Sequence, residues 1–381
     1  MAHSPVADAN PLLASPWPES EHGLPPFSSM KPEHFIPAFD AACATHLAEV
    51  AAIASNTAAP SFATVIEPLE AAGAALRDVQ RCFGVLCASV TTPELQAVER
   101  TMSPRLAAHA SAVYMYPGLF SKLDALYAAR TAAGLTSEQL RCVERHHLAF
   151  VREGGARLDA RGQQEYAAIT EQLAALETRF SQNVLADETE YTIPLSEADL
   201  SGCPPDLVAA ARCAALERQA TGDAVDAVAD GSNGASGAGT HVVTLSRSLV
   251  EPFLTFADRR DLRERAWRAW TRRGELNAER DNRRVILEIL RLRSRQAALH
   301  GYASFAEFQT ADTMAGSPAA VMRLLESVWP RAREAADRER SALAALQPQS
   351  VGAAADAPGT ADDDVAPWDW RYLAEKVRMQ G

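Results

Sequence analysis

The stretch from Asp258 to Trp329 constrains the fold most, because it reads as three amphipathic helices in succession. The first runs to Gly274 and has an apolar face opposite a face rich in arginine and glutamate. The apolar face consists of Leu262, Ala266, Ala269 and Trp270. Asp258 is expected to cap the start of this helix, and Gly274 to supply the left-handed residue that ends it.

The second helix is predicted from residue 282 to 300, with Gly301 as its stop. Its expected core positions are Ile286, Ile289, Leu290 and Ala297. Ser304 and Glu307 form a capping box for a short turn. Ser317 and Pro318 begin the third helix. The apolar stripe of that helix consists of Val321, Leu324, Leu325, Val328 and Trp329.

Helical periodicity also dominates the rest of the chain. It predicts helices over 30–55, 65–86, 91–102, 106–116, 136–151, 161–187, 205–219 and 368–378. Pro104 is expected to interrupt a helix, and Thr136 with Gln139 to form a capping box. Two short β-branched runs, 190–195 and 241–246, predict paired strands. The fold class is therefore mainly α, with many helices and one small β-hairpin.

Changes in composition predict four segments. Residues 1–28 are expected to form an extended arm and 29–155 an N-terminal helical domain. Residues 156–245 contain the longest helix and the hairpin, with a flexible Gly/Ser-rich insert at 222–239. Residues 246–381 hold the opening helices of a further domain, and a second low-complexity stretch covers 347–365.

The charge balance excludes some partners. The 381 residues carry a net charge of −12, whereas nucleic acids and anionic membranes need a basic face. Paired arginines such as Arg259–Arg260 and Arg283–Arg284 alternate with acids and are interpreted as solvated helix faces. The chain begins with no secretory signal and has no uncharged apolar run of membrane-spanning length, so we expect a cytoplasmic location and no membrane partner.

No catalytic, cofactor-binding or metal-binding residue is identified by pattern. The six cysteines contain no C-x-x-C pair and are expected to be buried, reduced thiols. No two of the nine histidines are four residues apart, so the H-E-x-x-H zinc motif is absent. His146 and His147 diverge on a helix, and His147 is expected to be a structural residue on the apolar stripe. Phosphate-binding loops and a nucleophile elbow are also absent.

Six stretches nevertheless resemble, in order, the zinc metallopeptidase family that contains thimet oligopeptidase, oligopeptidase A and bacterial peptidyl-dipeptidase, with the peptidyl-dipeptidase branch most similar. They are NPLL at 10–13 with KPEHFIPAF at 31–39; FSQNVL at 180–185; VTLS at 243–246 with RRDLRE at 259–264; DN at 281–282 through EILRLR at 288–293; HGYASFAEF at 300–308; and PWDWRY at 367–372.

The resemblance implies a two-lobed helical metallopeptidase with a channel that admits short unstructured peptides. In that family an H-E-x-x-H helix and a downstream glutamate hold zinc, and the motif glutamate is the general base. Those residues would follow the segment 367–372, beyond Gly381. We therefore expect a chain truncated before the zinc motif, with no zinc bound by this chain and no family site residue carried over to it.

Two functions remain open. The chain is either the N-terminal part of such a peptidase, catalytically incomplete as it stands, or a non-catalytic helical protein that binds peptides or a partner. In the first case, apolar side chains including Leu325, Val328, Trp329 and Trp368 should be exposed, at ~25 cal/mol per Å² of apolar area left in water. Aggregation or partial unfolding is then expected.

Overall fold

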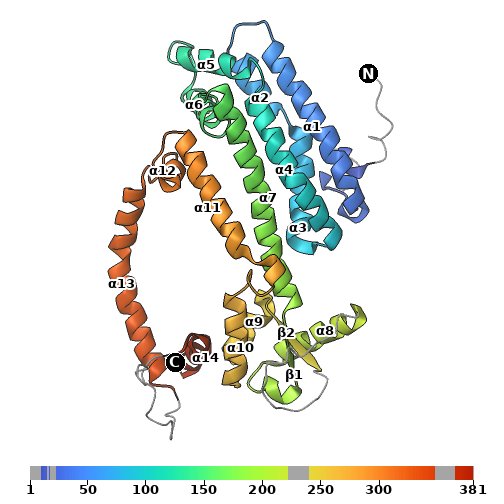
Figure 1. Cartoon of the computed structure of the whole chain (residues 1–381), viewed down its shortest axis with the longest axis vertical. Coiled ribbons are helices and arrows are strands. Elements are labelled where there is room, and N and C mark those ends of the chain that lie inside the picture. Colours follow the sequence, from blue (N-terminus) through green and yellow to red (C-terminus); the bar gives the residue numbers. More distant parts are fainter. Residues whose placement is uncertain (1–9, 15–16, 18–22, 222–239, 348–364, 381) are drawn as a thin grey trace. The chain divides into compact units, whose positions relative to one another are not determined.

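The computed structural model describes residues 10–14, 17, 23–221, 240–347 and 365–380. The expectation of a mainly α fold with one small hairpin is confirmed (Figure 1). The longer helices are α1 (Pro32–Ser55), α3 (Ala74–Val90), α4 (Pro93–Tyr114), α6 (Ser137–Arg152), α7 (Ala160–Glu190), α8 (Pro205–Thr221), α11 (Asn282–Leu299), α13 (Pro318–Ala344) and α14 (Pro367–Gln380). The shorter ones are α2 (Glu67–Ala71), α5 (Leu119–Ala129), α9 (Arg247–Phe256), α10 (Arg260–Thr271) and α12 (Phe305–Thr310).

The chain divides into two compact units. Unit 1 comprises residues 1–179 and 287–312, and unit 2 comprises residues 180–286 and 313–381. Helices α7 and α11 each continue from one unit into the other. The four segments expected from the sequence stay a prediction. The expected insert at 222–239, most of the stretch 347–365 and much of the N-terminal arm lie outside the described residues.

Two apolar clusters of described side chains lie in unit 1. In the first, α1 packs on α3 and α4 through Phe35, Phe39 and Phe83, and the rings of Phe39 and Phe83 meet edge to face with centroids 5.5 Å apart. Leu12 joins this cluster, and the Asn10 amide donates to the His34 carbonyl oxygen at 2.8 Å. Among the described helices, α1 is also long and apolar enough to cross a membrane by length and composition alone, but its rings are buried in the unit.

The second cluster joins α5 and α6 to a π-helical turn, Phe62–Ile66, that leads into α2. Its buried side chains include Val65, Ile66, Leu119, Leu123, Val143 and Phe150. Thr136 caps α6 as predicted: its side chain accepts from the Gln139 N–H, and the Gln139 side chain accepts from the Thr136 N–H.

Unit 2 is built around the hairpin and the helices α8 to α10. Strand β1 (Thr192–Leu195) pairs antiparallel with β2 (His241–Thr244), with Ile193 opposite Val243. One face of the hairpin contributes Ile193, Leu195 and Val243 to a core that also contains Leu249 and Phe253 of α9. The two apolar strands alone would be marginal, and packing against the helices stabilises them.

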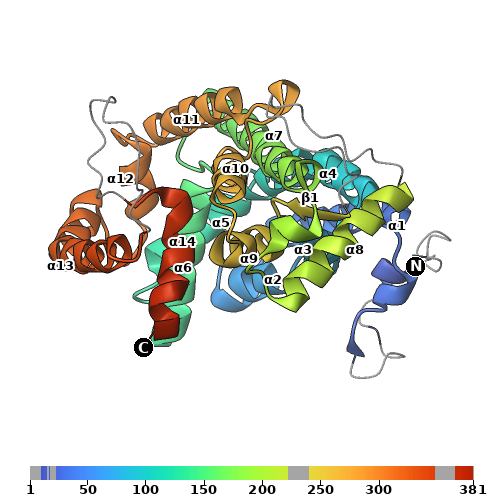
Figure 2. The ribbon, with the colours of Figure 1, turned by 90° about the horizontal axis from the view of Figure 1, so that it is seen from below.

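A buried ion pair attaches α14 to this unit, where α9, α10 and α14 lie side by side (Figure 1, Figure 2). The Arg263 guanidinium donates to Asp369 at 2.7 Å, and the two side chains are only 4% and 6% exposed. Arg263 also donates to the Ala257 carbonyl at 2.6 Å, and Arg260 donates to the second Asp369 oxygen at 2.8 Å. Every charged atom of this pair therefore has a partner, as a buried pair requires.

A second buried polar joint connects the end of α7 with the turn before α11. Asp187 is only 3% exposed. Its carboxylate accepts hydrogen bonds from the backbone N–H groups of Gly274 at 2.7 Å and Leu276 at 3.1 Å. The Asn183 amide donates to the Asn282 side chain at 2.8 Å, and the Asn282 amide donates to the Phe180 carbonyl at 3.0 Å. Gly274 has φ +86°, the left-handed conformation predicted for it.

Several expectations about individual residues are wrong. Asp258 does not cap α10; its carboxylate accepts from Ser201 at 2.8 Å and Tyr372 at 2.9 Å, because tertiary partners are within reach. Arg263 is not on a solvated face, since Asp369 compensates its burial. Pro104 does not interrupt α4. A proline inside a helix costs ~3 kcal/mol, and packing of the helix on both sides of Pro104 outweighs that cost.

Burial also departs from prediction in α11 and among the cysteines. In α11, Ile289 and Ala297 are buried as expected, but Ile286 and Leu290 are exposed, and the core contacts come from Val285 and Leu292 instead. All six cysteines are free thiols within the described residues, but only Cys82 is buried. Trp368 is half-buried against Trp267, whereas Leu325, Val328 and Trp329 are exposed as expected.

Removing one partner of the buried ion pair should destabilise unit 2 strongly. Asp369→Ala leaves the Arg263 charge buried and unpaired, and we expect a loss of about 3–5 kcal/mol in the free energy of unfolding. Urea titration followed by tryptophan fluorescence measures it, since Trp267 and Trp368 lie beside the pair. The control Glu375→Gln, on the same helix, removes only a pair with largely exposed Arg378 and should change the midpoint far less. Equal shifts in the two variants would contradict the assignment.

A histidine pair in unit 1 predicts loss of stability at low pH. Nδ1 of His46 in α1 lies 3.0 Å from Nε2 of His109 in α4, and burial lowers the pKa of both imidazoles. Because the folded pKa values lie below the ordinary value near 6.5, the unfolded state binds more protons as the pH falls below that value. The free energy of unfolding should therefore decrease from pH 7 toward pH 5.

The measurement compares urea titrations at these two pH values for the wild type and for the double variant His46→Gln, His109→Gln. The pH-dependent loss should be smaller in the double variant. An identical pH dependence in both proteins would show that other groups control acid sensitivity.

Candidate functional site

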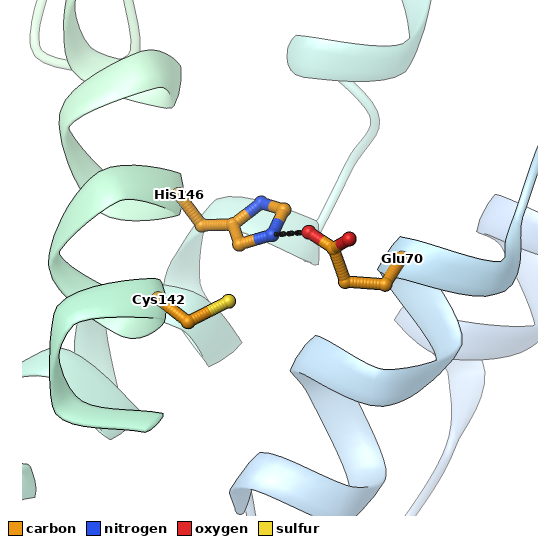
Figure 3. A group of neighbouring side chains, drawn as sticks. All are labelled: Glu70, Cys142 and His146. Atoms are coloured by element: carbon orange, nitrogen blue, oxygen red, sulfur yellow. Dashed lines mark hydrogen bonds and ion pairs between the residues drawn. The ribbon is translucent and has the colours of Figure 1, made fainter. Parts of the chain in front are cut away.

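The structure brings together one group of side chains that the sequence patterns did not single out. Glu70 of α2 and Cys142 and His146 of α6 place one donor atom each, all within 4.8 Å of one another (Figure 3). Nε2 of His146 lies 2.5 Å from Oε1 of Glu70, and an ionised Glu70 accepts the imidazole N–H. A thiol, an imidazole and a carboxylate therefore converge on one point of unit 1.

Helix α6 presents two of these groups because its faces are clearly separated. Val143, His147 and Phe150 form its buried face, so Cys142 and His146, four residues apart, share the adjacent face. Both are half-buried. His147 behaves as predicted: it is buried, stacks on the Tyr127 ring with centroids 3.8 Å apart, and bonds Asp124 at 2.9 Å. The adjacent histidines thus have different roles.

The second core cluster of unit 1 fixes the position of Glu70. Val65 and Ile66, in the π-helical turn directly before α2, are buried in the cluster that contains Val143 of α6. The backbone on either side of the site is therefore held by one apolar core. The Glu70 side chain itself is 62% exposed, so its carboxylate is free to adjust.

Charge around the site is nearly balanced. The pKa of the Cys142 thiol is raised, first by burial and then by the negative charge of Glu70, so the thiol is protonated at neutral pH in this state. Two neighbouring arginines are paired with acids elsewhere: Arg145 with Asp312 at 2.5 Å and Arg141 with Glu144 at 3.8 Å.

A surface cavity of about 690 Å³ adjoins the group. Glu70, Cys142 and His146 line it together with Tyr114, Ser137, Glu138, Arg141, Arg145 and Ala149. The Tyr114 hydroxyl donates to Glu153 at 2.9 Å, and burial and that carboxylate raise its pKa. The cavity gives a small polar molecule or an ion access to the three donors.

The sequence carries only a partial signal of this site. Cys142 and His146 have the same four-residue spacing as a pair of histidines in a zinc helix, and that spacing was the available signal. The third member comes from a helix 72 residues earlier than Cys142, and one sequence gives no information about that contact.

The group does not fit the catalytic zinc centre that the family resemblance implies. That centre needs two histidines one turn apart on a helix that also carries the general-base glutamate. The sequence has no such histidine pair. The group instead combines a thiol, one imidazole and a carboxylate, and the carboxylate of Glu70 is hydrogen-bonded to His146. We therefore derive no hydrolytic step from these residues.

Comparison with known proteins identifies the relatives of the chain. The family model described as peptidase family M3 matches residues 253–381. Dipeptidyl carboxypeptidase of Escherichia coli (strain K12) is 30% identical over 357 residues, which cover 93% of this chain and 48% of the relative. Oligopeptidase A of Salmonella typhimurium is 30% identical over 376 residues, covering 97% and 50%.

A plant relative agrees with the bacterial ones. The probable cytosolic oligopeptidase A of Arabidopsis thaliana is 26% identical and covers 99% of this chain. The chain spans about half the length of the curated relatives that it matches. The segments that resembled the oligopeptidases lie within these matches, and the chain is therefore similar to members of peptidase family M3.

Proposed function

We propose that this chain forms the helical, substrate-enclosing part of an oligopeptidase or peptidyl-dipeptidase that hydrolyses short unstructured peptides with zinc. The observation that carries the proposal is the match to dipeptidyl carboxypeptidase over 93% of the chain, at 30% identity. The match to the family model over residues 253–381 supports it independently. A cytoplasmic location is part of the proposal, which one relative named as cytosolic supports.

In this proposal the described residues supply the frame and not the hydrolytic chemistry. The segments that resemble the family form buried joints, such as Arg263 with Asp369 and Asn183 with Asn282. Water activation at neutral pH needs a bound metal or a strong general base, and the 381-residue sequence contains no H-E-x-x-H helix to hold zinc. In this proposal, peptide hydrolysis requires an H-E-x-x-H motif from additional polypeptide.

A chimaera tests the function. The 381 residues are fused to the part of Escherichia coli dipeptidyl carboxypeptidase that follows the matched half. Zinc-dependent cleavage of a short quenched peptide is expected, and the same fusion with a zinc-motif histidine replaced by alanine is the matched control. A folded, zinc-loaded chimaera that leaves short peptides intact would contradict the proposal.

The unfused chain should not cleave peptides. With equimolar zinc, hydrolysis of the same reporter should equal the buffer blank, because the sequence has no H-E-x-x-H helix to hold zinc beside a general-base glutamate. The assay follows fluorescence across a size-exclusion peak. Chelator-sensitive turnover that co-elutes with the chain would contradict this prediction.

A second function, partner binding without catalysis, is favoured by one observation. The first half of α13 exposes an apolar stripe: Met322, Leu324, Leu325, Val328 and Trp329 are each 50–66% exposed. Contiguous exposed apolar side chains of this kind mark interaction surfaces or aggregation-prone ones.

This stripe should limit solubility of the chain. The double variant Leu325→Glu, Trp329→Glu is expected to reduce light scattering at micromolar concentration, because it removes apolar area at ~25 cal/mol per Å². The control Ala335→Glu adds a charge further along α13. A wild-type chain that is monodisperse and melts sharply at a mesophilic temperature would contradict the prediction of aggregation.

A further inference from the structure

We propose that Glu70, Cys142 and His146 form a binding site for a zinc-like divalent cation. The donors come from α2 and α6 within unit 1, and their ligating atoms lie within 4.8 Å of one another. Among the residues that the structure describes, these three are the histidine, cysteine or acidic residues whose ligand atoms lie this close together as a group of three. The site departs from the expectation that this chain binds no zinc.

The distances are close to those of a tetrahedral site. Zinc–ligand bonds of ~2.0–2.3 Å place tetrahedral ligand atoms roughly 3.3–3.8 Å apart. Nε2 of His146 and Oε1 of Glu70 are closer than this, at 2.5 Å, and all three ligand atoms lie within 4.8 Å of one another, so an ion must move the imidazole and the carboxylate apart. The mostly exposed Glu70 side chain can make that adjustment while the core holds both helices.

The donor set selects the class of ion. Thiolate and imidazole suit zinc and similar transition metals, whereas magnesium and calcium prefer oxygen ligands throughout. On binding, the neutral imidazole takes the tautomer with its proton on Nδ1, by exchange with solvent, so the Nε2 lone pair and a Glu70 oxygen both turn to the metal in place of their shared hydrogen bond. The Cys142 proton leaves to solvent, and the S–H bond is replaced by a metal–sulfur bond with no change of oxidation state.

The surroundings allow a cation to enter. The positive charges of Arg141 and Arg145 are each paired with an acid outside the donor group. The cavity of about 690 Å³ opens onto all three donors, and Glu138, one turn before Cys142 on α6, lines it too. The fourth coordination position therefore faces the cavity, where water or a donor atom of a small ligand completes the shell.

The main competing site is the His46–His109 pair. Its nitrogens are 3.0 Å apart, but it presents two imidazoles and no thiolate. Cobalt(II) distinguishes the two sites, because a cobalt–thiolate bond gives a charge-transfer band in the near ultraviolet that cobalt–imidazole bonds do not give.

The experiment titrates the full 381-residue chain, reduced and metal-free, with Co²⁺ and then displaces it with Zn²⁺. One equivalent should bind with the thiolate band, and Cys142→Ser should abolish the band. His146→Gln and Glu70→Gln should each weaken Zn²⁺ binding by more than tenfold, since changes beyond the direct ligands already cost about 10–100-fold. Circular dichroism confirms that each variant is folded.

Matched controls are Cys213→Ser, an exposed thiol, and Glu67→Gln, one turn before Glu70 on α2, and neither should alter binding. A readout that needs no variant is alkylation by iodoacetamide, followed by mass spectrometry. Zn²⁺ should slow modification of Cys142 at least tenfold relative to Cys213 in the same molecules. A thiolate band that survives Cys142→Ser, the absence of stoichiometric binding, or no protection of Cys142 would each overturn the proposal.

Discussion

The buried carboxylate of Asp187 is the interaction on which the arrangement of unit 2 depends. It accepts two backbone N–H groups from the turn at Gly274 and Leu276, which would otherwise be buried without partners. A buried donor left unsatisfied costs ~1–3 kcal/mol, so the turn is stable only where Asp187 meets it. Asn183, one turn earlier on α7, binds Asn282 at the start of α11 and fixes the same crossing. Two helices distant in sequence are thereby joined by polar contacts of defined geometry.

The other segments that carry the family resemblance have similar structural roles. Asn10 of the first segment donates to the carbonyl of His34 in its companion segment. Asp369 of the last segment holds Arg263 of the third, and the His300 ring stacks on Phe308 within the fifth, with centroids 5.2 Å apart. These residues meet in pairs within a unit, and none of these contacts presents a nucleophile or a base to a cavity. The residues that carry the resemblance therefore have structural roles in this chain. The proposed hydrolysis depends on a zinc-binding motif from other polypeptide.

Local patterns predicted the elements of this frame well and its tertiary contacts poorly. Helical periodicity, the Thr136 cap and the left-handed Gly274 are encoded within a few residues and are confirmed. Helices α5 and α9 were not predicted, since their short apolar runs are organised by packing and not by capping signals. The burial of Arg263 and the role of Asp258 depend on α14, more than 100 residues away, so their own surroundings suggested a solvated arginine and a helix cap. Cys142 and His146 showed the correct spacing, but Glu70 joins them only through the fold.

Hydrogen exchange of Asp187→Ala tests most directly whether this buried carboxylate holds the turn before α11 on the end of α7. Mass spectrometry of peptides that span Gly274–Leu276 and the end of α7 gives the exchange rates in the variant and the wild type. The matched variant Asp206→Ala, in the first turn of α8, removes a carboxylate from a helix end in the same unit. We expect the backbone amides of Gly274 and Leu276 to exchange at least tenfold faster in Asp187→Ala, which corresponds to ~1.4 kcal/mol of lost protection, and to be unchanged in Asp206→Ala. Unchanged protection at both amides in Asp187→Ala would contradict the account.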